Sequence, residues 1–271
     1  MSDFLKSMSV SSAARAAAAS QSVTAKDLDK PVYPLQLNSF DLIAEIKNRS
    51  PAEGELAANA GSRVLRALTY ANAGAAAISV LTEPEKFDGE LWHLEEVVEA
   101  IAATSTPVMR KDFLVDVAQI IEARVAGASG ILLIAAMLSD AKLASMLDCA
   151  FEHDLFVLLE AFDENDLDRS IAFLNRPIYR EQAEKNQLLL GINTRNLRTL
   201  EVDAKRLEQF ATKLPEDVVC VAESGQHSAE DALRVRQWGY SAALVGTALM
   251  RAEDPGQLVS DMLQAGRAFK G

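Results

Sequence analysis

Acidic, basic and amide side chains recur where the apolar segments of this chain end. These residues are Glu45, Lys47, Lys111, Glu160, Asn193 and Glu223. A positioned lysine can donate a proton or bind an anion, and a carboxylate can accept a proton or return it. If the fold brings these groups together, the chain holds the side chains that acid–base catalysis on an anionic substrate requires.

Lys111 and Glu160 are the candidates for proton transfer. We expect neighbouring cations and partial burial to lower the pKa of Lys111 towards neutrality, which would make proton donation easier. Glu160 follows Val157-Leu158-Leu159, and apolar walls raise the pKa of a carboxyl group. The alternative is that each residue is a solvated loop charge, but the recurrence of such residues at equivalent places favours a site.

Glu45 and Lys47 lie two residues apart, so in a strand both side chains point to the same face. Ile43 shares that face, and Ile46 points the other way. The alternative is a buried ion pair that only fixes the strand, and such pairs are weak evidence for stability. Because charges also end later apolar segments, we favour a functional role for both residues at the mouth of a cavity.

The elements that must position these residues alternate between predicted strands and predicted helices. We expect strands at 41–47, 76–81, 107–111, 131–134, 155–160, 188–193, 218–223 and 241–245. We expect helices at 62–73, 91–103, 117–126, 139–153, 165–174, 204–213, 228–238 and 255–269, with a short extra helix from 246. This order predicts an α/β fold, a closed (β/α)8 TIM barrel, whose active site lies at the carboxyl ends of the strands.

Several segments lie outside this alternation. We expect polar loops over 48–61 and 82–90, and over 175–187 a surface insertion far from the chemistry. Residues 1–39 form an N-terminal arm with a helical extension, and 40–271 form a single barrel domain. The stretch 11–20 has strong helix propensity but little apolar pattern. The arm is therefore either a loosely attached, partly disordered helix or a flap over one end of the barrel.

Two glycine-containing pairs predict a phosphate-binding cradle. Ser224-Gly225 follows the seventh predicted strand, and Gly246-Thr247 follows the eighth. Glycine lets backbone amides approach an anion closely, and a helix N-terminus attracts one. Barrels often bind phosphate with the loops after these two strands. Arg195 could add a charge-assisted contact.

Composition excludes several kinds of partner. The net charge of −12 argues against nucleic acid or an anionic membrane. Cys149 and Cys220 form no CxxC pair, and we interpret both as reduced core thiols. His93, His153 and His227 show no metal spacing, so we predict no metal. With no apolar run long enough for a signal peptide or a membrane span, we expect a cytoplasmic protein, interpreted as a monomer, that binds a small molecule.

Several motifs of the chain resemble those of the indole-3-glycerol phosphate synthase family. They are Ala44-Glu45-Ile46-Lys47-Asn48-Arg49-Ser50-Pro51, Ile78-Ser79-Val80-Leu81-Thr82-Glu83 with Phe87 and Gly89, Arg110-Lys111-Asp112-Phe113, Gly191-Ile192-Asn193-x-Arg195-x-Leu197, Glu223-Ser224-Gly225 and Leu244-Val245-Gly246-Thr247. The resemblance implies a carboxy-lyase of tryptophan biosynthesis that needs no cofactor. Its substrate would be 1-(2-carboxyphenylamino)-1-deoxyribulose 5-phosphate, which ring closure, decarboxylation and dehydration convert to indole-3-glycerol phosphate.

The same resemblance implies a role for each site residue. Lys111 would be the general acid, Glu160 the general base, and Lys47 the ligand of the substrate carboxylate. Glu45, Asn193 and Glu223 would position these groups and the sugar hydroxyls. The phosphate ligands would be Ser50, Arg195, Ser224, Gly225, Gly246 and Thr247. The anthranilate ring would lie against Phe87, Phe113 and Leu132.

Two rival functions remain open. Ala52 and Glu53 in the first loop, together with Asn196 and Gln226, differ from the usual family pattern. They motivate the first rival, a divergent paralogue that binds a phosphorylated ligand without turnover. The second rival is a related phosphosugar isomerase such as phosphoribosylanthranilate isomerase. That reaction requires a carboxylic acid and a thiol base near the first strand, whereas both cysteines lie elsewhere.

Overall fold

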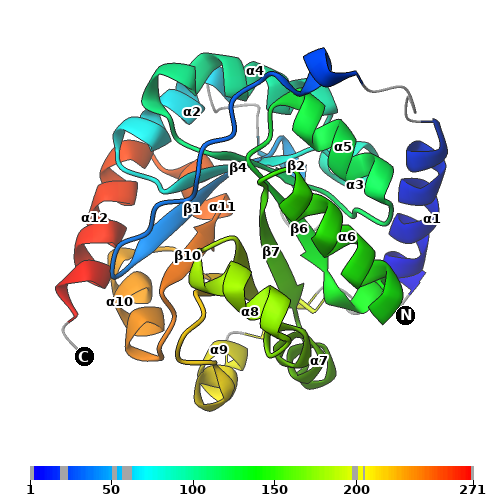
Figure 1. Cartoon of the computed structure of the whole chain (residues 1–271). Helices are drawn as coiled ribbons and strands as arrows, with labels where there is room; N and C mark the ends of the chain where they lie inside the picture. The colour runs from blue at the N-terminus through cyan, green and yellow to red at the C-terminus, as the bar shows by residue number, and fades with distance from the viewer. Residues whose placement is uncertain are drawn as a thin grey trace.

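The computed structural model describes residues 3–18, 24–50, 54–56, 63–196, 201–203 and 205–269. At its centre is a closed barrel of parallel strands in the order β1-β10-β9-β8-β7-β6-β5-β4 (Figure 1). The strands are β1 (Asp41–Ile46), β4 (Ala77–Leu81), β5 (Val108–Lys111), β6 (Gly130–Ile134), β7 (Phe156–Ala161), β8 (Leu188–Asn193), β9 (Cys220–Glu223) and β10 (Ala242–Val245). The predicted (β/α)8 barrel is thereby confirmed.

Helices surround the barrel, as Figure 1 shows. They are α2 (Arg63–Asn72), α4 (Leu91–Ile101), α5 (Val117–Ala126), α6 (Asp140–Glu152), α7 (Glu164–Leu174), α9 (Arg206–Phe210), α10 (Ala229–Gln237), α11 (Thr247–Arg251) and α12 (Pro255–Ala268). Every residue of β6 and β7 is buried. Apart from Glu160 near the end of β7, both strands are apolar, as is usual for parallel strands covered on both faces. Local signals set the helix ends: Asp116 caps α5, and Gly127, with φ +97°, ends it.

Strand register brings the carboxyl ends of distant strands to one rim. Lys111 pairs with Leu81 across β5 and β4. Asn193 pairs with Glu223 across β8 and β9, and Glu160 pairs with Gly191 across β7 and β8. Residues 30 or 31 positions apart in the sequence therefore become neighbours at this end of the barrel.

Three segments outside the predicted alternation contain regular structure. The surface insertion predicted over 175–187 holds α8 (Pro177–Glu184), which buries Tyr179 and Ala183. The loop over 82–90 holds α3 (Pro84–Phe87). In the described part of 48–61, β2 (Arg49–Ser50) pairs with β3 (Gly54–Glu55) in antiparallel fashion. The predicted helix start at Ser62 lies outside the described residues.

The N-terminal helix α1 (Asp3–Ala18) packs firmly on the barrel. It buries Leu5, Met8, Ser12 and Ala16, which recur on one side of a helix. Gln119 of α5 donates a hydrogen bond of 2.9 Å to the hydroxyl of Ser12. The interpretation as a loosely attached helix was therefore wrong, because Ser12 and Ala16 continue the buried side that begins with Leu5 and Met8.

Short 3-10 turns complete the chain, and one of them leads from the arm into the barrel. These turns are η1 (Ala25–Leu28), η3 (Ala102–Thr104), η4 (Ala135–Met137) and η5 (Ala211–Lys213). After η1, residues 29–40 run past the amino-terminal end of β6, where the backbone N–H of Tyr33 donates to Ser129 at 3.0 Å. The arm thus contacts both ends of the barrel, because α1 lies near the carboxyl end of β5.

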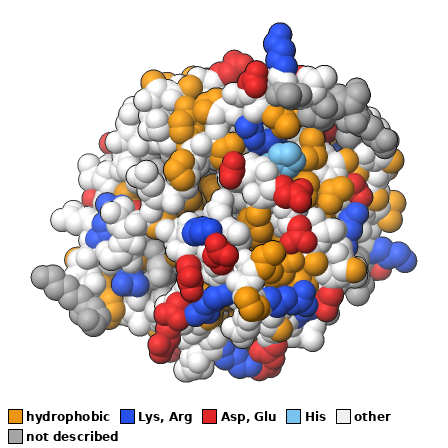
Figure 2. All heavy atoms as spheres, viewed as in Figure 1, with side chains coloured by type: hydrophobic (Ala, Val, Ile, Leu, Met, Phe, Trp, Pro, Cys, Tyr) orange, Lys and Arg blue, Asp and Glu red, His pale blue; other side chains and the backbone are white. Residues whose placement is uncertain are grey.

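The face seen in Figure 2 carries acidic and basic side chains interspersed with one another. They do not gather there into a basic patch, in keeping with the net charge of −12. Among the described helices, none has the length and apolar character needed to cross a membrane.

Candidate active site

A cavity of about 300 Å³ opens at the carboxyl ends of the strands. A volume of this order lies at the lower end of the range for small-molecule sites. The structure brings every predicted site residue to its walls. They are Glu45, Lys47, Ser50, Phe87, Lys111, Phe113, Leu132, Glu160, Asn193, Arg195, Glu223, Ser224, Gly225, Gly246 and Thr247.

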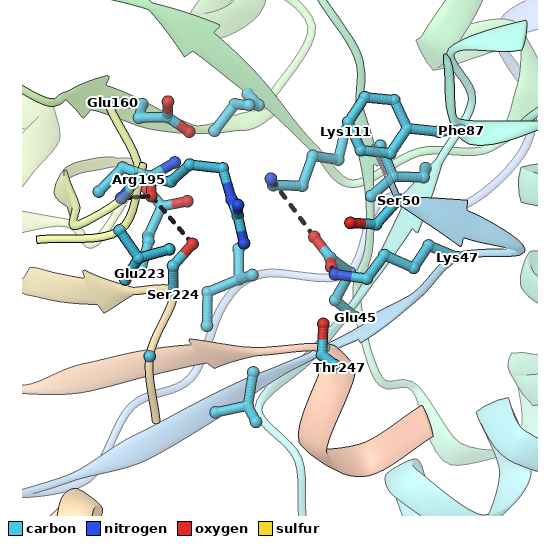
Figure 3. A pocket seen from close by; sticks show the side chains of 18 of the residues that line it. Glu45, Lys47, Ser50, Phe87, Lys111, Glu160, Arg195, Glu223, Ser224 and Thr247 are labelled. Carbon is cyan, nitrogen blue, oxygen red and sulfur yellow. Dashed lines mark hydrogen bonds and ion pairs between the residues drawn. The ribbon is translucent and has the colours of Figure 1, made fainter. Parts of the chain in front are cut away.

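One buried carboxylate joins the two lysines of the cavity. Lys47 donates to Glu45 Oε1 at 2.5 Å, and Lys111 Nζ lies 3.3 Å from Glu45 Oε2. Figure 3 shows both ammonium groups directed at this carboxylate, from β5 and from the residue after β1. Although burial alone would raise it, the two lysines lower the pKa of Glu45 to about 2. Glu45 is therefore a fixed negative charge that holds both cations in place.

The pKa of Lys111 differs from the sequence-based expectation. Burial alone would lower it, but the carboxylates of Glu45 and Glu160 outweigh burial and raise it above the ordinary lysine value. The prediction of a pKa lowered towards neutrality was wrong, because the close neighbours of Lys111 are mostly acids and not cations. Lys111 consequently carries its proton at neutral pH.

Glu160 and Glu223 form a pair of buried acids. Burial raises the pKa of Glu160, as the sequence predicted. Burial and the neighbouring Glu160 carboxylate raise the pKa of Glu223 well above its ordinary value. Neither oxygen of Glu223 accepts a hydrogen bond from a described donor, which suits a protonated carboxyl group. We interpret the pair as a Glu223 acid that donates to a Glu160 carboxylate, because two like charges side by side cannot both ionise easily.

Two glycines make room for the acids. A Cβ atom on Gly191 would lie 2.1 Å from Glu223 Oε1, and one on Gly246 would lie 2.2 Å from Glu45 Oε1. Real Cβ atoms do not tolerate such contacts, so any side chain at either position would displace a carboxylate. Gly246 therefore serves the cluster around Glu45 as well as the predicted phosphate cradle.

The Ser224-Gly225 turn has an unusual backbone. Ser224 has φ +65° and Gly225 has φ +86°, and a left-handed backbone is uncommon for a residue other than glycine. The Ser224 hydroxyl and the backbone N–H of Arg195 both donate to Asn193 Oδ1, each at 2.9 Å. The side-chain amide of Asn193 also lowers the pKa of Glu160, against the larger effect of burial. Asn193 thus ties the turn to the buried acids.

Aromatic and aliphatic side chains form the apolar wall. The Phe87 and Phe113 rings lie 6.2 Å apart, and Phe4 of α1 meets Phe113 edge to face at 5.8 Å. Leu132 of β6 lines the same cavity. Arg15 of α1 holds this helix by a bidentate ion pair with buried Asp112, each bond being 2.8 Å. The arm therefore contributes to the cavity, as the interpretation of a flap requires.

Sequence reasoning missed several residues of the cavity wall. They are Phe4, Leu81, Asp112, Ile134, Val202, Gln226, His227, Leu244, Val245 and Ala248. Phe4 gave no signal, because α1 lacks an apolar pattern. Gln226 had been noted only as a difference from the family, and its amide donates to the Ser224 carbonyl at 2.7 Å. Of the other differences, Ala52 and Glu53 lie outside the described residues.

Fold and cavity together define a class of protein, a (β/α)8 barrel with lysines, buried acids and a glycine-lined turn at the carboxyl ends of its strands. The chain matches the indole-3-glycerol phosphate synthase family over residues 7–262, and it belongs to that family. A protein of this name from Paenarthrobacter aurescens (strain TC1) is 42% identical over 231 residues, which cover 85% of this chain and 79% of the relative. Another, from Listeria monocytogenes serovar 1/2a (strain EGD-e), is 41% identical over 220 residues, covering 80% of each chain.

Solved structures share the fold at much lower identity. 3-Hexulose-6-phosphate synthase from Salmonella typhimurium superposes with a TM-score of 0.63 at 14% identity, over 84% of this chain and 99% of that one. Phosphoribosyl anthranilate isomerase from Thermotoga maritima gives a TM-score of 0.55 at 11% identity, over 84% of this chain and 100% of that one. At these identities the likeness extends to the barrel alone.

Proposed function

We propose that this cavity carries out the reaction of the indole-3-glycerol phosphate synthase family, a carbon–carbon lyase step of tryptophan biosynthesis. The substrate is 1-(2-carboxyphenylamino)-1-deoxyribulose 5-phosphate. A ring carbon attacks the ketone, carbon dioxide leaves, and loss of water gives indole-3-glycerol phosphate. The observation that carries the proposal is the placement of an ammonium acid, a buried carboxylate base and an apolar wall around one cavity, in a chain of this family.

Lys111 protonates the ketone oxygen as the new carbon–carbon bond forms. Its raised pKa suits this role, because the oxygen that gains the negative charge becomes a stronger base than a lysine amine. Lys47 binds the substrate carboxylate and orients the ring for attack. Glu45 holds both lysines at the distances seen here. Side chains alone meet the developing charge, so the proposed chemistry includes no cofactor.

Glu160 removes the proton that must leave during dehydration. Burial raises its pKa above the ordinary value, while its protonated neighbour Glu223 helps to keep it a carboxylate, and such a base can both accept and return a proton. Asn193 and Glu223 orient Glu160 and the sugar hydroxyls. This assigns the two acids different duties, although they lie side by side.

The phosphate group binds where the segments after β1, β8, β9 and β10 meet. Its ligands are Ser50, Arg195, Ser224, Gly225, Gly246 and Thr247. The left-handed turn at Ser224 and Gly225 presents backbone amides, and successive amides of this kind favour anions. The anthranilate ring lies against Phe87, Phe113 and Leu132.

The test is turnover by the purified chain. We expect formation of the indole product with one carbon dioxide released for each substrate consumed. Lys111→Met is the control, since it removes the acid while keeping the length of the side chain. Substrate binding without turnover would instead support a non-catalytic paralogue. Conversion of phosphoribosylanthranilate would support the isomerase, but neither Cys149 nor Cys220 lines the cavity to provide a thiol base.

We also propose that residues 40–271 form one barrel domain, with 1–39 as its arm, and that the chain acts as a monomer in the cytoplasm. The location follows from the proposed place in amino-acid biosynthesis. A mass near 29.3 kDa in light scattering would support the monomer, and twice that mass would contradict it.

A further inference from the structure

Glu83 is a fully buried acid that the proposed reaction does not use. It follows β4 at the start of the loop that carries Phe87, and it is 0% exposed. Its carboxylate accepts backbone N–H bonds from Glu85 at 2.9 Å, Lys86 at 2.7 Å and Phe87 at 3.2 Å. One side chain therefore satisfies three amides at the start of α3, whereas most capping residues satisfy one or two.

Further contacts hold the rest of the loop close to Glu83 and the end of β4. The backbone N–H of Gly89 donates to the Glu83 carbonyl at 2.9 Å. A Cβ atom on Gly89 would lie 2.6 Å from the Leu81 carbonyl oxygen, so only glycine allows the chain to return this closely. Asn48, after β1, donates to the Asp88 carbonyl at 2.8 Å. The loop is thus tied at its start, at its end and to the neighbouring strand.

This arrangement fixes the position of Phe87. The α3 helix has four residues, and so short a helix cannot maintain itself in water. Phe87 packs against the core, but no residue of α3 is fully buried, so packing holds this helix only weakly. The Glu83 carboxylate supplies the missing constraint, because it bonds to the amide of Phe87 itself. Figure 3 shows the Phe87 ring at the cavity, on the side of Lys111 and Ser50.

We propose that Glu83 is a positioning residue for recognition of the aromatic ring of the substrate. It does not line the cavity and acts through Phe87, whose ring it holds against the apolar wall with Phe113. This inference rests on the proposed function, since it takes the aromatic group to be the anthranilate part of the substrate. Loss of the carboxylate frees the loop, and the ring subsite is then formed only part of the time.

Glu83→Ala tests the proposal by separating KM from kcat. We expect KM to rise about tenfold, which corresponds to the usual cost of losing a helix cap, with kcat changed less than threefold. Glu83→Gln keeps one acceptor oxygen and should recover most of the affinity. Asp254→Ala is the matched control: Asp254 caps α12 through Gln257 at 2.9 Å and lies outside the cavity wall, so KM should not change.

A double-mutant cycle tests whether Glu83 influences KM through Phe87. If Glu83 acts through Phe87, then Glu83→Ala should not raise KM further in a Phe87→Ala background. If the two substitutions instead raised KM by factors that multiply, Glu83 would act independently of Phe87, and this inference would be wrong. Amide hydrogen exchange supplies a readout apart from turnover, and we expect faster exchange at Lys86 and Phe87 in Glu83→Ala. A wild-type chain without turnover would contradict the proposed function, whereas an active wild type with unchanged KM in Glu83→Ala would contradict this inference alone.

Discussion

Lys111 illustrates how neighbours set the charge of a catalytic side chain. Its strand supplies only the position, while Glu45 and Glu160 come from two other strands and raise its pKa. The residue is therefore charged before substrate arrives, and it can bind the substrate electrostatically as well as donate a proton. Because the proton is donated only in the reaction step, we expect the loss of Lys111 to affect turnover more than binding.

Replacement of Lys111 by methionine tests this directly. We expect Lys111→Met to lower kcat by about a hundredfold or more, which is the usual contribution of a general acid. Steady-state kinetics of product formation measures the change. Lys142→Met is a matched control, because Lys142 forms an ion pair with Asp116 at 2.6 Å outside the cavity wall. Wild-type turnover in Lys111→Met would remove Lys111 from the acid role.

The pairing of Glu160 with Glu223 predicts a change in pH dependence. The acid limb of kcat/KM reports the pKa of the base in the free enzyme. Glu223→Leu removes the proton donor that stabilises the Glu160 carboxylate, so the pKa of Glu160 should rise and the limb should move to higher pH. Glu223→Gln retains an N–H donor and should shift the limb less. A limb that moves to lower pH in Glu223→Leu would mean that Glu223 is ionised.

For single residues, the sequence predicted where the site residues lie in the fold better than it predicted their pKa values. Glu160 and Asn193 could be found because each ends an apolar strand of a recognisable pattern. The pKa of Lys111 could not be predicted, since its acidic neighbours lie far away in the sequence. Glu45 is 66 positions before it, and Glu160 and Glu223 are 49 and 112 positions after it. The need for glycine at 191 was equally hidden, because it depends on contact with Glu223 of the next strand.

Among the elements, α8 shows what a composition-based prediction overlooks. Its residues are polar overall, but Tyr179 and Ala183 lie four apart and face inwards. Tyr179 is 3% exposed, stacks on Phe173 at 5.8 Å and donates to Asp148 at 3.1 Å. Two buried residues were too few for a periodic signal, although Pro177 at the first helical turn was a valid one.

Removal of the Tyr179 side chain should therefore affect stability without affecting catalysis. We expect Tyr179→Ala to lower the free energy of unfolding by about 3 kcal/mol, in the range for loss of a buried aromatic ring, with kcat and KM unchanged. Urea denaturation and steady-state kinetics measure the two effects. Ile178→Ala on the same helix is the control, because Ile178 is 59% exposed and should change stability little. A raised KM in Tyr179→Ala would show that α8 influences the site.

The N-terminal helix α1 marks a second limit of sequence reasoning at this scale. Its buried side is built from Leu5, Met8, Ser12 and Ala16, so half of the stripe is polar or small. A specific contact attaches this helix to the barrel, the ion pair of Arg15 with Asp112, which lies one residue after Lys111. A single sequence cannot indicate such a long-range pair, because neither partner is unusual where it stands.

For the molecule as a whole, the alternation of strands and helices was sufficient to predict the closed barrel. Each strand could be located by its apolar run, and a barrel fixes which ends meet. The sequence could not give the register, which places Glu160 beside Gly191 and Asn193 beside Glu223. That register crowds several acids into one buried cavity. The free energy of unfolding of the barrel should therefore depend on pH.

Proton linkage makes this cost measurable. With the pKa of Glu223 raised well above 4.5 in the folded chain, the folded state keeps a proton that the unfolded state releases. Stability should then fall as pH rises above the ordinary glutamate value, with a slope approaching about 1.4 kcal/mol per pH unit. Glu223→Gln imitates the protonated acid and has no such slope. We expect it to be more stable than wild type at neutral pH, with the difference closing as pH falls through the ordinary range. Urea denaturation at a series of pH values measures this difference, and an advantage that does not vary with pH would contradict a protonated Glu223.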